Sequence, residues 1–220
     1  MEAPGTPAAR RPLKSRQAAW AKTLAAWLTR AGARPNHISL ASILFAAAAA
    51  AALYCGRDAE PSLRMGLFFA AAAGIQLRLL CNLLDGMVAV EGGMKTRTGE
   101  LYNDIPDRIA DALIFVAAGY SLTWPAYGAE LGWTAALLAV MTAYVRVLGG
   151  SVGVTQYFIG PAAKQQRMAI LTLCCLAAIA ETALGWPPRV VAVALAVIIA
   201  GEIVTLVRRV ARIARDMEAR

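Results

Sequence analysis

Four polar side chains near the middle of the chain have the types and the spacing to bind a hard metal ion. Asn82 and Asp85 lie three residues apart in an apolar stretch, and Asn103 and Asp107 lie four residues apart in the next one. On a helix, residues three or four apart share a face. Carboxylate and amide oxygens are ligands that Mg2+ and Mn2+ accept. The spacing therefore predicts that two helices direct oxygen ligands to one point.

The residues around these four also indicate a site. Gly86 and Ala89 keep the face of Asn82 small, so that a ligand or a neighbouring helix can approach closely. Arg78 lies one helical turn before Asn82, and Asp111 extends the acidic face of the second helix. Charged groups in a membrane segment are costly unless they pair, face a cavity or bind an ion. Their presence here therefore favours a functional site.

The composition is that of an integral membrane protein. Of the 220 residues, 59% are hydrophobic, and the mean hydropathy is +0.54. The formal net charge of +8 comes from Lys and Arg residues that concentrate toward both ends of the chain. Because the chain has no soluble domain to carry a nucleic-acid groove, they indicate attraction to anionic membrane lipids rather than nucleic-acid binding. The four cysteines have neither metal-ligand spacing nor a disulfide framework and are expected to be buried small apolar residues.

The apolar pattern predicts an all-α polytopic membrane protein. Residues 1–13 are expected to form a flexible tail, and residues 14–33 an amphipathic interfacial helix anchored by Trp20 and Trp27. Residues 34–220 are expected to form one catalytic domain of six transmembrane helices, each near the roughly 20 residues that a bilayer requires. These helices are expected at residues 38–55, 65–89, 101–123, 130–150, 166–185 and 187–207.

The distribution of Lys and Arg over the connections predicts the orientation. The N-terminal segment, residues 91–100, residues 151–166 and the C-terminal tail are basic, and they alternate with connections that are poor in basic residues or balanced by acids. By the positive-inside rule, both termini and the site face the cytoplasm, at the inner (plasma) membrane of a bacterium. Residues 185–188, Gly-Trp-Pro-Pro, leave almost no loop, so the last two spans should form a tight hairpin.

The polar spacing resembles the motif of the CDP-alcohol phosphatidyltransferase family, which reads Asp-x2-Asp-Gly-x2-Ala-Arg-x8-Gly-x3-Asp-x3-Asp. All of its spacings match here, and so do five of its eight residue types. The departures are two Asn residues in place of acids and Val90 in place of the Arg. The motif positions are Asn82, Asp85, Gly86, Ala89, Val90, Gly99, Asn103 and Asp107.

The resemblance implies a metal-dependent enzyme of phospholipid biosynthesis. It would transfer a phosphatidyl or similar phospho-alcohol group from a CDP-linked lipid, expected to be CDP-diacylglycerol, to a hydroxyl acceptor, and release CMP. Asn82, Asp85, Asn103 and Asp107 would bind Mg2+ or Mn2+, and Asp107 would also take the acceptor proton. Two Asp and two Asn carry a formal charge of minus two, so we expect one tightly bound divalent ion rather than two. Family members are commonly homodimers, and a homodimer is expected here.

The phosphate groups of such substrates require cations besides the metal. The residues expected to contact the substrates are Arg78, Arg146, Lys164, Arg167 and the small residues Gly86, Ala89 and Gly99. Two alternatives stay open for the cations. Lys164 and Arg167 have a topological explanation, because positive residues mark cytoplasmic loops. A salt bridge to Asp85 would equally explain Arg78.

Two other functions compete with this interpretation. One is a catalytically inactive family member that acts as a membrane scaffold, against which the retained Asp85 and Asp107 argue. The other is a small transporter, which would need polar residues deep in several spans rather than at one membrane face. Glu181 and Glu202, in the last two spans, are expected to make packing hydrogen bonds or to lie at helix ends.

Overall fold

The computed structural model describes residues 17–94, 96 and 98–219, and this part of the chain folds into seven α-helices without a strand. The predicted tail at residues 1–13 lies outside the described residues. The helices are α1 (Ala19–Arg30), α2 (Pro35–Cys55), α3 (Pro61–Glu91), α4 (Gly99–Tyr120), α5 (Gly128–Ser151), α6 (Lys164–Ala183) and α7 (Val190–Glu218). The all-α prediction is confirmed.

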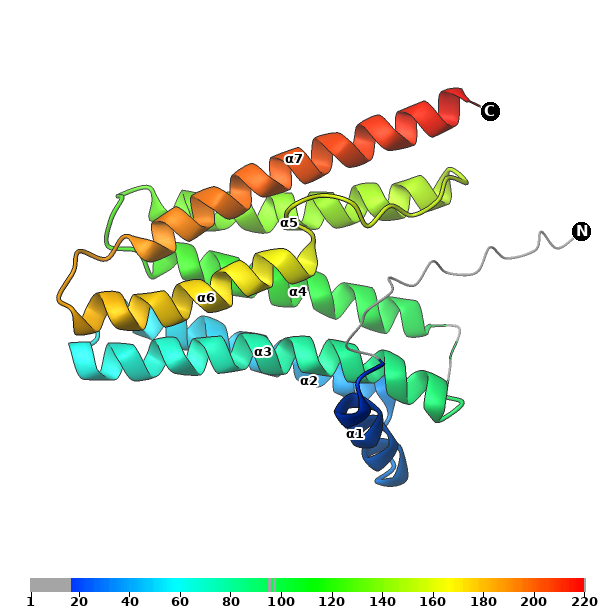
Figure 1. The fold of residues 1–220 in the computed structure, drawn as a ribbon, viewed down its shortest axis with the longest axis horizontal. Helices are drawn as coiled ribbons and strands as arrows, with labels where there is room; N and C mark the ends of the chain where they lie inside the picture. Colours follow the sequence, from blue (N-terminus) through cyan, green and yellow to red (C-terminus); the bar gives the residue numbers. More distant parts are fainter. Residues whose placement is uncertain (1–16, 95, 97, 220) are drawn as a thin grey trace, which may run out of the picture.

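Helices α2 to α7 form one bundle, and α1 lies across one end of α3 (Figure 1). Around the bundle, α2 packs against α3, α3 against α6, α6 against α7, α7 against α5, α5 against α4, and α4 against α2. The six helices therefore close into a ring. The connections alternate between its two ends, and the predicted hairpin of the last two helices is confirmed by the packing of α6 on α7 (Figure 1).

Five of these helices, α2, α3, α5, α6 and α7, are long and apolar enough to cross a membrane. The exception within the ring is α4, which has 22 residues but carries Asp104, Asp107, Arg108 and Asp111. The helix ends agree with the predicted spans to within four residues, except that α7 continues to residue 218 instead of ending at 207. The prediction ended α7 where the apolar run ends, but Ala and Arg are strong helix formers and extend the helix.

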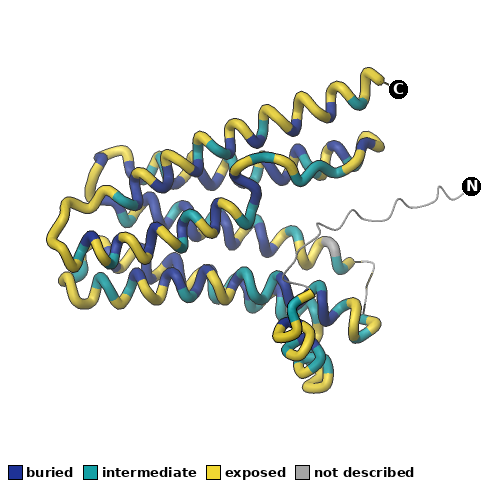
Figure 2. The backbone as a smooth tube through the Cα atoms, viewed as in Figure 1, coloured by how far each residue is buried: buried dark blue, intermediate teal, exposed yellow. Residues whose placement is uncertain are grey.

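Small residues let the helices approach closely. Buried residues line the inside of the ring, and its outer faces are exposed (Figure 2). At the crossing of α4 and α5, a Cβ atom on Gly132 would lie 2.6 Å from the carbonyl oxygen of Phe115 and 2.8 Å from Cα of Gly119. The two backbones are therefore in contact, as in other membrane helix pairs with small interfacial residues.

The end of the bundle remote from α1 contains a buried acid that caps a helix. Glu181 Oε1 accepts hydrogen bonds from the backbone N–H groups of Arg189 and Val190, at 2.8 and 3.1 Å. These are groups at the start of α7, which lack partners inside the helix. The predicted helix-end role of Glu181 is confirmed.

The N-terminal helix packs on the bundle through its smallest residues. Ala21 and Ala25 are fully buried in a cluster with residues of α3, including Leu84 and Val88. Trp20 and Trp27 instead stay exposed, at 54% and 59%. These tryptophans are therefore available to a surrounding medium, and α1 itself is held by α3. All four cysteines are free, but only Cys174 and Cys175 are buried, and Cys55, at the end of α2, is exposed, so the expected burial was wrong for Cys55.

Candidate active site

A cavity of about 980 Å3 lies at the end of the bundle where α3 ends and α4 begins. Its volume is at the upper end of the range typical of ligand pockets. The predicted site residues that line it are Asn82, Asp85, Gly86, Ala89, Gly99, Asn103, Asp107, Arg146, Lys164 and Arg167. The helix period thus places the polar faces of α3 and α4 opposite each other, as the sequence predicted.

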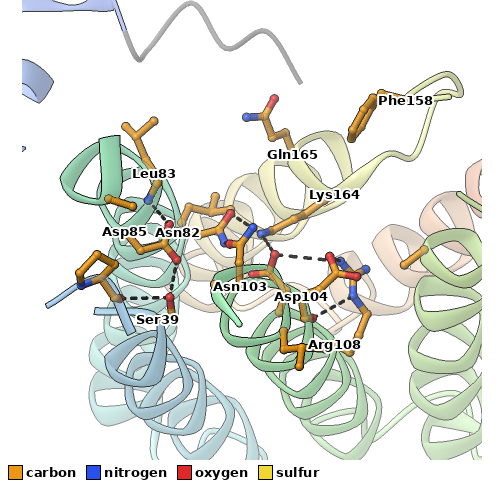
Figure 3. Close-up of a pocket in the computed structure, with 18 of the residues that line it drawn as sticks. Ser39, Asn82, Leu83, Asp85, Asn103, Asp104, Arg108, Phe158, Lys164 and Gln165 are labelled. Atoms are coloured by element: carbon orange, nitrogen blue, oxygen red, sulfur yellow. Dashed lines mark hydrogen bonds and ion pairs between the residues drawn. The ribbon is translucent and has the colours of Figure 1, made fainter. Parts of the chain in front are cut away.

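Three of the motif side chains meet around Lys164, the first residue of α6 (Figure 3). Its ammonium group donates hydrogen bonds to Asn82 Oδ1 and to Asp107 Oδ2. The amide of Asn82 in turn donates to Asn103 Oδ1 at 2.9 Å. The side chains of Asn82 and Asn103 therefore join α3 to α4 directly, and Lys164 adds a positive charge at their meeting point.

The second carboxylate of the motif, Asp85, is held by neighbours of its own. Ser39 of α2 donates to Asp85 Oδ2 at 2.6 Å, and the backbone N–H of Gly86 donates to Oδ1 at 2.5 Å (Figure 3). The residue is 4% exposed. These two hydrogen bonds fix the carboxylate of Asp85 at the edge of the cavity without a positively charged partner.

The donor chemistry fits one hard divalent cation. Two carboxylates, Asp85 and Asp107, and two amide oxygens, on Asn82 and Asn103, line the same cavity. Mg2+ is commonly held by one or two carboxylates together with substrate phosphates. Among the described residues there is no group of three or more His, Cys, Asp or Glu side chains placed to hold a metal ion. A metal at this site would therefore need substrate or water oxygens to complete its coordination.

Arg78 lies behind the cavity rather than among its lining residues. It is fully buried, and its Nη2 atom lies 3.2 Å from Asp107 Oδ1 and 2.5 Å from Asp111 Oδ1. The same atom donates to the backbone oxygen of Asp107 at 3.2 Å. The alternative of a salt bridge to Asp85 was wrong, because Arg78 points toward α4 and pairs with Asp107 and Asp111 instead.

Two known proteins resemble the chain over most of its length. It is 27% identical to a phosphatidylinositol phosphate synthase of Streptomyces avermitilis over 199 residues, which are 87% of this chain and 77% of that protein. It is also 27% identical to the Escherichia coli inner membrane protein YnbA over 151 residues, which are 69% of this chain and 71% of that protein. No family model matches the sequence.

Solved structures share the fold. The chain superposes on the Mycobacterium tuberculosis phosphatidylinositol phosphate synthase PgsA1 with CDP-DAG bound, with a TM-score of 0.72, 20% identity, and coverage of 89% of this chain and 94% of that one. The same enzyme in complex with manganese and citrate gives a TM-score of 0.71 at 20% identity, covering 88% of both chains. The resemblance to the CDP-alcohol phosphatidyltransferase family is confirmed.

On the α5 side of the cavity, Arg146 lies among residues that were not predicted to contact substrate: Asp104, Arg108, Gln156 and Phe158. Arg146 Nη2 lies 2.9 Å from Asp104 Oδ1, and its guanidinium lies 5.2 Å from the ring centroid of Phe158. Arg108 Nη2 lies 3.4 Å from the same oxygen of Asp104. Gln156 accepts a weaker hydrogen bond from Arg146 at 3.4 Å. Arg146, predicted to contact substrate, therefore already has an acidic and an aromatic partner.

The family motif gave no signal for several other lining residues. Ser39 and Asp85 are 46 residues apart, so no local pattern connects them. Thr142 and Arg209 also line the cavity, and Arg209 donates to the backbone oxygens of Thr142 and Ile159. An intramembrane hydroxyl is the only sequence signal that would have found Ser39 and Thr142. Arg209 lies just beyond the predicted span 187–207, where basic residues are expected in any case.

Proposed function

We propose that the chain transfers a phosphatidyl group from CDP-diacylglycerol to the hydroxyl of an alcohol, with release of CMP. The observation that carries the proposal is the convergence of Asn82, Asp85, Asn103 and Asp107 on one cavity, in the fold of a synthase whose structure holds CDP-DAG. The sequence relative over 87% of the chain is likewise a phosphatidylinositol phosphate synthase. Both fold and motif position therefore support the same reaction class.

The residues of the cavity have distinct roles in this reaction. The Oδ2 atom of Asp107 takes the proton of the acceptor hydroxyl as its oxygen attacks the lipid-bearing phosphorus. The new P–O bond replaces the anhydride P–O bond, and CMP leaves with that electron pair. A divalent ion held by Asp85 and Asp107, with help from the two Asn oxygens, would stabilise charge on the diphosphate. Lys164 supplies a further cation at the same place.

The cations on the α5 and α6 side support a phosphorylated acceptor. Arg146, Lys164 and Arg167 all line the cavity, and each offers N–H donors to phosphate oxygens. Arg146 is paired with the partly exposed Asp104, and Arg167 is buried and paired with Asp111 and Glu202. The partners of Lys164, Asn82 and Asp107, line the cavity, so its ammonium group lies where a substrate phosphate would bind. Gly86, Ala89 and Gly99 leave room for the donor.

The placement in the membrane is part of the proposal. α4 crosses the membrane together with the five apolar helices, and its charges are tolerated because they face the cavity and the interior of the ring. α1 lies in the interface with Trp20 and Trp27 at headgroup level. The site and both termini face the cytoplasm of a bacterial inner membrane, because the described basic residues gather at the site end of α7 and in the first turn of α6. The protein acts as a homodimer.

CMP release by the purified protein in lipid nanodiscs tests the reaction. With CDP-diacylglycerol, Mg2+ or Mn2+ and a panel of alcohols, we expect release that depends on both metal and acceptor and stops on addition of EDTA. Phosphorylated alcohols are expected to be the better acceptors. No release with any acceptor, from protein that still binds the CDP-lipid, would support a scaffold instead.

The number of metal ions tests the composition of the site. Because the two Asn residues remove two negative charges, titration with Mn2+ by calorimetry is expected to give one tight site. The variant Asn103→Asp restores one acid and is expected to bind Mn2+ about tenfold more tightly, since affinity rises with the charge of the ligands. Two tight sites in the unaltered protein would contradict this assignment.

A further inference from the structure

A chain of five alternating charges runs from the cavity into the middle of the bundle. It consists of Asp107, Arg78, Asp111, Arg167 and Glu202, and we refer to it as the ion-pair chain. Its members come from α3, α4, α6 and α7. The catalytic motif contains only the first of them.

Each link of the ion-pair chain is a direct contact. Arg78 Nη2 lies 3.2 Å from Asp107 Oδ1 and 2.5 Å from Asp111 Oδ1. The other oxygen of Asp111, Oδ2, pairs with Arg167 Nη2. The second nitrogen of Arg167, Nη1, lies 3.3 Å from Glu202 Oε1 and donates to the hydroxyl of Thr142 at 3.2 Å. The carboxylate of Asp111 thus bridges two arginines, and each arginine bridges two carboxylates.

Stability does not explain the ion-pair chain. Arg78, Asp111 and Glu202 have no exposed surface, and Arg167 is 1% exposed. Replacing a buried ion network by apolar residues of similar volume is often neutral or stabilising. In addition, Arg167 Nε and Glu202 Oε2 have no hydrogen-bond partner among the described residues. A network that is costly to bury and incompletely satisfied needs a different reason for its presence.

The geometry at Asp107 supplies that reason. Arg78 contacts Asp107 through both its backbone oxygen and its Oδ1 atom. These two contacts leave Oδ2, the oxygen that meets Lys164, directed toward the substrate cavity. Arg78 is itself held by the stronger contact to Asp111. Without that contact, the guanidinium would be free to pair with both oxygens of Asp107, because Arg favours bidentate pairing with a carboxylate.

We propose that Asp111 and Glu202 are positioning residues that act through Arg78 and Arg167 to hold Oδ2 of Asp107 toward the substrate. Asp111 holds Arg78 by a second contact and so limits its side-chain contact with Asp107 to Oδ1, and Glu202 in turn fixes Arg167 on Asp111. This inference rests on the proposed function, because it takes Asp107 to be the proton acceptor. Glu202 thereby has a role in catalysis, beyond the packing hydrogen bonds or helix-end position that the sequence led us to expect.

Steady-state kinetics of CMP release tests the proposal. The variant Asp111→Asn is expected to lower kcat about a hundredfold, because a displacement of about 1 Å at a reacting group costs that much. Glu202→Gln keeps an acceptor for Arg167 but removes the charge, and a smaller loss of about tenfold is expected. KM for CDP-diacylglycerol should stay within about twofold, since the substrate contacts themselves are intact.

Glu181→Gln is the matched control. Glu181 is also a buried acid, 8% exposed, but it contacts backbone N–H groups at the other end of the bundle. Its variant should keep the kcat of the unaltered protein. The double variant of Asp111→Asn with Glu202→Gln should be no slower than Asp111→Asn alone, because the two residues act along one path.

The outcomes separate the inference from the proposed function. An inactive Asp107→Asn together with unchanged kcat in Asp111→Asn and Glu202→Gln would overturn the inference and leave the reaction standing. Full activity in Asp107→Asn would overturn the role of Asp107 and the inference with it. A fall in thermal stability of Glu202→Gln without a fall in kcat would also overturn it. If Asp111→Asn does not fold, the kcat of Glu202→Gln still tests the proposal.

Discussion

At the end of the bundle that contains the cavity, charged side chains of α3, α4, α6 and α7 are buried against one another, whereas at the opposite end α4 and α5 meet through glycines. The only described acid buried near that opposite end, Glu181, contacts backbone N–H groups of the α6–α7 hairpin. The two ends therefore hold the helices together by different means.

This difference between the two ends distinguishes the contacts that stabilise the fold from those that serve the site. Close contact of small residues is sufficient to pack membrane helices. Buried charges add no comparable stability, and they are costly when a partner is lost. Their concentration beside the cavity indicates that they serve the chemistry. Substitutions at the two ends should accordingly affect different measurements.

The largest effect is expected at the cavity, from Asp107→Asn. Loss of the proton acceptor should lower kcat for CMP release at least a hundredfold, the usual contribution of general base catalysis. The side chain keeps its shape, so the variant should elute from size-exclusion chromatography as the unaltered protein does. An effect below about threefold would place the base elsewhere and remove the contrast between the two ends.

At the opposite end, Gly132→Ala should change stability instead. Alanine is the better helix former by about 1 kcal/mol. However, its Cβ would lie 2.6 Å from the carbonyl oxygen of Phe115, a clash with backbone that no rotamer relieves. We expect a net destabilisation of about 2 kcal/mol, measured by thermal or denaturant unfolding in detergent.

Gly66→Ala is the control for this substitution. Its Cβ would have no neighbour within 4 Å, so the same change should be neutral or slightly stabilising. Equal destabilisation of the two variants would mean that the contact of α4 with α5 is not what matters at Gly132.

Removal of the cavity cation by Lys164→Gln is expected to act on substrate binding. The loss of a charge-assisted hydrogen bond should raise KM for a phosphorylated acceptor about tenfold, with a smaller change for an uncharged alcohol. Arg208→Gln, an exposed arginine of α7, should leave both values unchanged. The same rise in KM for both kinds of acceptor would mean that Lys164 does not recognise a phosphate.

The smallest effect is expected from Glu181→Gln. The amide still accepts a hydrogen bond but lacks the charge that favours the N-terminus of α7, so the free energy of unfolding should fall by about 1 kcal/mol. Thermal unfolding measures this loss. A kcat below that of the unaltered protein would show that the two ends of the bundle are not independent.

The sequence predicted the meeting of α3 and α4 because the helix period alone fixes which residues share a face. Asn82 and Asn103 could be placed on the cavity in this way. The partners of Arg78 could not, because they depend on the depth at which α4 lies beside α3. The pairing of Arg167 with Glu202 likewise spans 35 residues and follows only from the neighbourhood of α6 and α7 in the ring.

The end of α7 could not be predicted for another reason. Hydropathy marks where a helix leaves the apolar layer, but it does not mark where the helix ends. The basic residues after 207 continue the α-helix to Glu218. The place of Ser39 in the site could not be predicted, because its partner, Asp85, belongs to a different helix.

The ion-pair chain also constrains biogenesis. An arginine in the middle of a nascent membrane segment costs about 3 kcal/mol to insert, and α3 carries Arg78 before its acidic partners in α4 have been synthesised. Arg167, near the start of α6, differs in this respect, because its partner Asp111 is already present in α4 when α6 is made. The charge of Arg78 is therefore compensated only when α4 has entered the membrane. A chain that stalls before α4 would leave an arginine in the apolar layer without an acidic partner, so α3 and α4 are expected to enter the membrane together.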